Sequence, residues 1–159
     1  MTPIGALEAS AFGAALRDSA WLFPAIKAAH LAGITMLLGS VAVLDLRLLG
    51  VRRSFPVRRL AARTLPWSVG SFALILPSGL AMFVAHAGEL IASPVFAFKF
   101  CLIFAAGVNA AVFHAGVYRS AALWDTGAMP PWPARAAAAL SLLLWVSVVA
   151  CGQRLASGQ

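Results

Sequence analysis

Four runs of about 20 mostly apolar residues divide this chain of 159 residues and limit what it can fold into. As helices, runs of this length match the thickness of the hydrocarbon core of a bilayer. Hydrophobic residues make up 62% of the sequence and charged residues 11%, whereas a soluble domain is about half apolar and about a quarter charged. We therefore expect an all-α protein, a four-transmembrane-helix bundle that forms a single membrane domain over residues 1–159.

The apolar runs predict spans over about residues 28–48, 65–87, 95–118 and 134–155. Short connections between successive spans predict an up-down-up-down bundle. Residues 1–20 lack the basic start and the cleavage site of a signal peptide, and they carry Glu8. Leu7, Phe12 and Leu16 fall on one side of a helix, so this segment is either a short helix on the membrane surface or a frayed terminus.

Positive charge is concentrated in the first and third connections, which hold eight of the twelve basic residues: Arg47, Arg52, Arg53, Arg58, Arg59, Arg63, Arg119 and Arg135. The positive-inside rule places these connections in the cytoplasm, and it places both termini on the outer, periplasmic side of a bacterial inner membrane. Because the basic residues lie between apolar runs, the net charge of +7 indicates membrane orientation. We expect no nucleic-acid partner for this multi-pass protein.

All three histidines, His30, His86 and His114, lie within the predicted spans. An ionisable side chain in a bilayer is costly, and it is therefore a candidate functional group. A rise of about 1.5 Å per residue places His30 about 12 Å and His86 about 15 Å from the middle of the membrane toward the outer face. The same rise places His114 about 10 Å toward the inner face. We therefore expect His30 and His86 to be nearly level on adjacent antiparallel helices.

Two level imidazoles with small residues beside them are typical of bis-histidine ligation of haem b. Gly79 lies seven residues before His86, and Gly33 lies three residues after His30. The basic residues that would meet the haem propionates at the outer face are Arg17, Lys27 and Arg154. We expect a haem b protein that transfers single electrons, with His30 and His86 as axial ligands and membrane quinone as a partner. His114 is a further cofactor-binding candidate, and a haem there needs another axial ligand.

Other interpretations stay open. Each histidine also fits a structural role, in which it reaches interfacial water or bonds to another helix. Copper handling is a second functional class, because soft ligands gather in the outer half: Cys101, Cys151, Met36, Met82, His30 and His86. A third is a non-catalytic membrane subunit of a larger complex, and the large apolar surface is also compatible with a homodimer. No motif for catalysis by protein side chains is present, so any chemistry would be that of a cofactor.

Three further polar residues have structural interpretations. Asp45 and Arg47 end the first span, where they are expected to anchor the basic connection. Asn109, near the middle of the third span, is expected to bond to another helix.

The segment WLFPAIKAAHLAGITMLLGSVAVLDLRLLG, with RTLPW at the start of the second span and VNAAVFH in the third, resembles a family of small bacterial four-helix membrane proteins. The resemblance extends from about Trp21 to His114, and none of its motifs is diagnostic of a reaction. Its pattern supports the positions of His30 and His114 better than that of His86. The architecture is also similar to small four-helix b-type cytochromes, which implies electron exchange between quinones and periplasmic partners.

Overall fold

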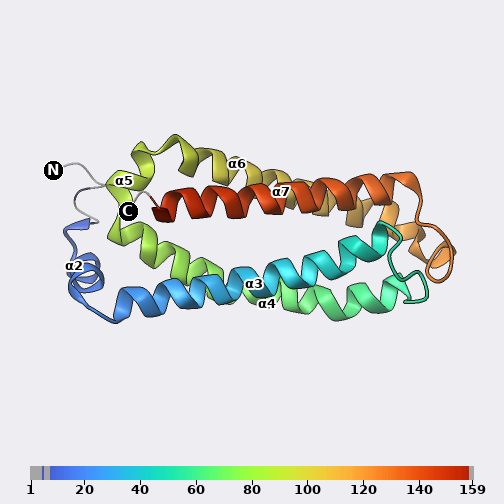
Figure 1. The fold of residues 1–159 in the computed structure, drawn as a ribbon, viewed down its shortest axis with the longest axis horizontal. Coiled ribbons are helices and arrows are strands. Elements are labelled where there is room, and N and C mark those ends of the chain that lie inside the picture. Colours follow the sequence, from blue (N-terminus) through green and yellow to red (C-terminus); the bar gives the residue numbers. More distant parts are fainter. Residues whose placement is uncertain (1–4, 6–7, 158–159) are drawn as a thin grey trace.

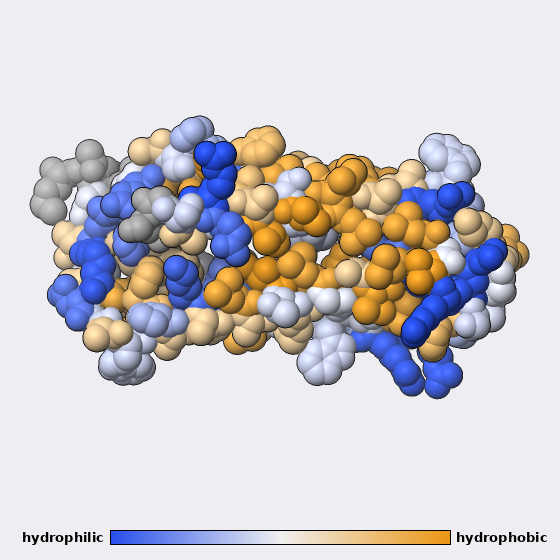
Figure 2. All heavy atoms as spheres, viewed as in Figure 1, coloured by the Kyte–Doolittle hydropathy of each residue, from blue (hydrophilic) through white to orange (hydrophobic). Residues whose placement is uncertain are grey.

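The computed structural model describes residue 5 and residues 8–157, and over these residues it contains helices and no strands. Four helices are long and apolar enough to cross a membrane: α3 (Leu22–Leu48), α4 (Val57–Ala85), α6 (Pro94–Ala115) and α7 (Trp132–Ser157). They alternate in direction along the bundle (Figure 1). Apolar residues gather over the middle of the molecule between two hydrophilic ends (Figure 2). These features confirm the predicted all-α fold with four spanning helices.

The two ends of the bundle differ. At one end, here called the terminal end, lie α2 (Ala11–Asp18), α5 (Ala87–Ala92) and the last turn of α7 (Figure 1). At the other, here called the basic end, lie the connections that follow α3 and α6, with the 3₁₀ helix η1 (Val117–Leu123). Which end faces the cytoplasm stays a prediction from the arginine distribution.

The helices begin and end at residues other than those that hydropathy alone predicts. Helix α3 begins at Leu22 rather than near residue 28, and α4 begins at Val57 rather than near residue 65. Backbone hydrogen bonds continue past each apolar run, and the Ser19 hydroxyl accepts from the Leu22 N–H at the start of α3. Helix α6 ends at Ala115 rather than at residue 118, because Gly116 leaves helical geometry with φ −108° and ψ −98°.

The four spanning helices form two pairs. Helix α3 packs along α4, α6 packs along α7, and the pairs meet where α3 contacts α7. The backbones of α4 and α6 stay further apart in the described chain, and these two helices touch through the stacked rings of Phe83 and Phe96. Gly33 allows the first pair to approach closely, since a Cβ atom there would lie 2.8 Å from Ile75 Cγ1. The room that Gly33 provides is therefore taken up by α4, and its predicted role beside a cofactor stays a prediction.

Helix α2 covers the terminal end of the α3–α4 pair. The Ser10 hydroxyl caps the helix by accepting from the Gly13 N–H. Leu16 is fully buried against Ala81 and Ala85, whereas Phe12 is exposed. The predicted helix at the start of the chain thus exists over Ala11–Asp18, and Leu7 lies outside the described residues.

Arg47 holds the basic end together. Its side chain is 2% exposed, and its guanidinium donates to the carbonyl oxygens of Phe55 at 2.7 Å, Asp125 at 3.0 Å and Arg53 at 3.2 Å. Asp125 continues the connection, because one of its carboxylate oxygens accepts from the Arg58 N–H at 2.8 Å. The predicted anchoring role is therefore confirmed for Arg47, which ties the loop after α3 to the loop after η1.

Replacing Arg47 by leucine should destabilise the protein by about 3 kcal/mol, because three buried carbonyl oxygens lose a charged donor. The melting temperature in detergent should fall by about 5–10 °C, measured by circular dichroism or by thiol-dye fluorescence. Arg59→Leu is the matched control, since Arg59 is exposed on the first turns of α4. Equal melting temperatures for the two variants would contradict the role assigned to Arg47.

Candidate functional site

The three histidines occupy three different environments. His30 lies within α3, His86 lies at the junction of α4 and α5, and His114 lies at the basic end of α6. Each is partly buried. The first two belong to the terminal half of the bundle, as predicted, and the third lies at the opposite end.

His30 is hydrogen-bonded to α4. Its Nδ1 lies 2.9 Å from the Ser78 hydroxyl, and that hydroxyl is also within hydrogen-bonding distance of the Leu74 and Ile75 carbonyl oxygens. When the hydroxyl hydrogen is directed to Leu74, the hydrogen between the two side chains comes from His30 Nδ1. In the neutral imidazole, Nε2 then carries the free lone pair that a metal or a hydrogen-bond donor would use.

Gly79 makes this position of the ring possible. A Cβ atom at residue 79 would lie 3.1 Å from His30 Cε1 and 3.5 Å from His30 Nδ1. The imidazole therefore lies against the bare backbone of α4. The sequence associated Gly79 with His86 and Gly33 with His30, whereas in the structure Gly79 lies against His30 and Gly33 lies against Ile75 of α4.

His86 does not belong to a helix. It lies between α4 and α5 with φ −139° and ψ 38°, and its ring packs at 5.2 Å from the ring of Phe23 in α3. Its Nδ1 is buried and has no hydrogen-bond partner among the described residues. Since an imidazole nitrogen without a partner is costly, this atom is available to a ligand.

His30 and His86 are not level. His30 faces Ser78 and Gly79, whereas His86 faces Phe23, which precedes His30 by seven residues on α3. Seven residues correspond to about 10 Å along a helix. Hydropathy predicted the same depth for the two side chains because the first residues that it predicted for the first two spans lie too far along the chain. The predicted axial pair of His30 and His86 stays a prediction.

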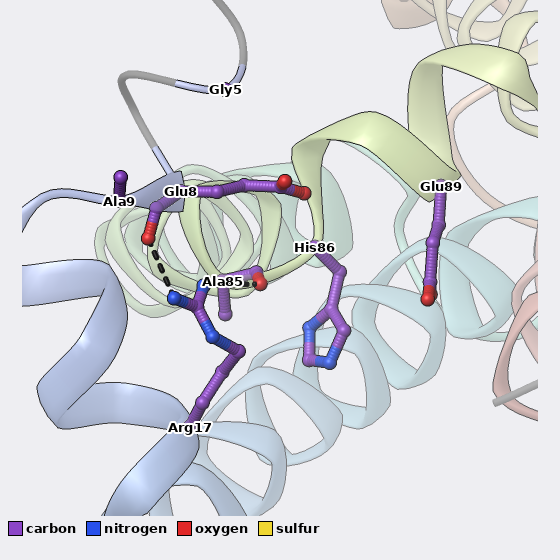
Figure 3. A pocket seen from close by; sticks show the side chains of 7 residues that line it. All are labelled: Gly5, Glu8, Ala9, Arg17, Ala85, His86 and Glu89. Carbon is purple, nitrogen blue, oxygen red and sulfur yellow. Dashed lines mark hydrogen bonds between the residues drawn. The ribbon is translucent and has the colours of Figure 1, made fainter.

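A polar pocket of about 390 Å³ lies beside His86 at the terminal end (Figure 3). Arg17 crosses it and donates to the carbonyl oxygens of Ala85 at 3.0 Å and Glu8 at 2.6 Å. The Glu8 carboxylate in turn accepts from the Gly88 N–H at 2.7 Å. The sequence predicted that Arg17 would meet haem propionates. In the structure Arg17 lies close to His86, and its hydrogen bonds to main-chain oxygens already connect α2 to the end of α4.

His114 lines a second cavity, of about 340 Å³, at the basic half of the bundle. Its Nδ1 donates to the Ala110 carbonyl at 2.9 Å, so Nε2 is the acceptor nitrogen of the neutral ring. That Nε2 is buried without a hydrogen-bond partner among the described residues. Asn109 lines the same cavity and donates to the Ala137 carbonyl of α7 at 3.0 Å, as predicted for this amide.

Sequence reasoning missed that Asp45 shares this cavity with His114. The available signal was a four-residue spacing on two helices, which places residues on one helical face. Ala106, Ala110 and His114 follow this spacing on α6, and Ala137, Ser141 and Trp145 follow it on α7; all six line the cavity.

The ligands that the sequence suggests for copper are Cys101, Cys151, Met36, Met82, His30 and His86. Over residue 5 and residues 8–157, no group of three or more His, Cys, Asp or Glu side chains is placed to hold a metal ion. Cys101 is exposed and Cys151 is partly buried, and both are free thiols. Lys99 lies near Cys151, because its Nζ is 3.8 Å from the position that a Cβ atom of the adjacent Gly152 would take.

Ser78→Ala should destabilise the protein by about 1–2 kcal/mol, because the buried Nδ1–H of His30 loses its acceptor. Ser71→Ala is the matched control on the same helix, since the Ser71 hydroxyl bonds only within α4, to the Ser68 carbonyl. Thermal melting of both variants in one detergent compares them directly. A Ser78→Ala protein as stable as the Ser71→Ala protein would show that His30 does not depend on this bond.

Comparisons with known proteins place the chain in one family. No curated protein matches the chain, and no solved structure matches it. One family model matches residues 19–157, and it describes a family of unknown function, DUF6644. The match covers all four spanning helices and the three histidines. The chain therefore belongs to the DUF6644 family.

Proposed function

We propose that this protein binds haem b in the terminal half of the bundle and transfers single electrons in a bacterial inner membrane. The observation that carries the proposal is the hydrogen bond between His30 and Ser78. A histidine that ligates a metal usually donates its other ring N–H to a fixed acceptor, which orients the ring and leaves the second nitrogen for the metal. His30 Nδ1 lies 2.9 Å from the Ser78 hydroxyl, and with Nδ1 as the donor Nε2 keeps the lone pair for the metal.

The residues present fit one axial ligand well. Gly79 lets the His30 ring lie against α4 without a clash. His86 is the candidate for the second ligand, because its buried Nδ1 has no partner among the described residues. A haem held by both would have to accommodate their offset of about 10 Å along the helix axes. When bound, the haem iron would supply the one-electron chemistry.

The protein's own side chains would set the environment of that cofactor. Lys99 lies within Coulombic reach of His30, and Arg17 lies at the His86 pocket. Both side chains carry positive charge, which stabilises the reduced state of a cofactor and the negative charge of haem propionates. Membrane quinone is the expected partner, since the exposed apolar surface of the spanning helices is in contact with the lipid in which quinones dissolve.

An absorption spectrum of the detergent-purified protein, oxidised and then reduced with dithionite, tests the proposal directly. We expect a Soret band and sharp reduced α and β bands, with one haem per chain by pyridine haemochrome. His30→Ala should remove most of the haem, because the axial ligand is lost. His86→Ala should convert a low-spin spectrum to a high-spin one if His86 is the second ligand.

His114→Ala supplies a matched histidine substitution at the opposite end of the bundle, and its haem content should equal that of the wild type. Haem retained in full by both His30→Ala and His86→Ala would overturn the assignment of the site. A colourless protein from haem-replete cells would overturn the function itself. Metal analysis of that protein would then decide whether copper is bound, and a fixed copurifying partner would indicate a subunit role.

A further inference from the structure

The cavity at the basic half of the bundle is built from one face of each spanning helix. Its lining includes Asp45 from α3, Phe72 from α4, Asn109 and His114 from α6, and Ser141 and Trp145 from α7. Most other lining residues are apolar, and its volume is about 340 Å³. Sites for small organic molecules have this size and this composition, with few polar groups among apolar walls.

Two side chains that line this cavity each carry a buried acceptor atom without a partner among the described residues. Asp45 is 6% exposed, and its Oδ2 is buried without a hydrogen bond in the part of the chain that the structure describes. His114 Nε2 is buried and unbonded in the same way. The Ser141 hydroxyl lies beside the carboxyl group of Asp45. Both unbonded atoms belong to side chains that line the cavity.

An unpartnered acceptor in an apolar interior is energetically costly. Two of them in one cavity are therefore expected to be met by donors on a ligand. The acceptors come from α3 and α6, and no Cα atom of one helix lies within 8 Å of a Cα atom of the other in the described chain. A ligand that satisfied both would need donors on opposite sides of a small rigid core.

The cavity opens toward lipid between α4 and α6. Leu65 and Val69 on α4, and Gly107 and Ala110 on α6, line it and are also exposed. A Cβ atom at Gly107 would meet nothing within 4 Å, so there is open space beside that glycine. A molecule dissolved in the bilayer could therefore enter from the side, and Phe72 and Trp145 offer aromatic walls for a ring.

We propose that this cavity binds a lipophilic hydroquinone, with one ring hydroxyl donating to Asp45 Oδ2 and the other to His114 Nε2. An aromatic ring with two opposed hydroxyl donors and an apolar tail matches the acceptors, the walls and the lateral opening. The choice of a quinol as the natural ligand rests on the proposed electron-transfer function, whereas the cavity and its unpartnered acceptors do not.

The test measures binding of a decyl-substituted hydroquinone to the protein in nanodiscs of neutral lipid, anaerobically, by quenching of tryptophan fluorescence. The dimethyl ether of the same molecule keeps the shape and lacks both donors. We expect saturable binding of the hydroquinone and at least about tenfold weaker binding of the ether, which corresponds to about 1.4 kcal/mol. Equal binding of the two molecules would overturn recognition by donors. Tighter binding of decylamine than of the hydroquinone would overturn the choice of a neutral ligand.

Two glycine variants locate the site. Gly107→Leu should fill the opening and weaken hydroquinone binding at least about tenfold. Gly70→Leu is the matched control, because residue 70 also has open space around a Cβ atom but does not line the cavity. Equal weakening by both variants, or by neither, would overturn the location. The assay does not depend on haem, so a colourless protein that binds the hydroquinone would defeat the proposed function and leave this site standing.

Discussion

The lack of water in the membrane core is the constraint on which this structure depends, because each polar group there must find its partner within the chain. Most hydroxyls in the spans solve this locally. Thr35, Thr64 and Ser68 donate to carbonyl oxygens one turn earlier on their own helices. Such bonds satisfy the side chain but fix nothing between helices. The few polar side chains that reach across therefore decide how the helices are registered.

These crossing bonds follow the division of the bundle into two pairs. His30 with Ser78, and the two hydroxyls of Ser40 and Ser68 at 2.8 Å, register α3 against α4. Asn109 registers α6 against α7. Between the pairs, close backbone approach runs through α3 and α7, whereas α4 and α6 touch through the rings of Phe83 and Phe96 near the terminal end. The basic-half cavity is a consequence, because four helices that packed on all sides would close the space beside Gly107.

Hydropathy was sufficient to predict the four spans, because length and apolar composition determine which segments cross a bilayer. It could not predict where each helix begins, since backbone hydrogen bonds continue into polar residues that flank the core. Because of that error His86 was predicted to lie level with His30, whereas in the structure the ring of His86 packs against Phe23. The four-residue spacing on α6 and α7 indicates which faces line the cavity, but it does not give the joint position of Asp45 and His114. That position depends on how α3 and α6 are rotated about their axes, which one sequence does not state.

The two proposed sites lie at different depths, and this has an energetic consequence. Asp45 follows His30 by 15 residues on one continuous helix, which is about 22 Å along the helix axis. That length is most of the hydrocarbon thickness of about 30 Å. An electron that passed between a quinol at Asp45 and a haem at His30 would therefore cross most of the membrane potential. A full crossing is worth about 2.3 kcal/mol per 100 mV, so the driving force of this transfer would change with the membrane potential. Two sites on the same side of the bilayer would not have this property.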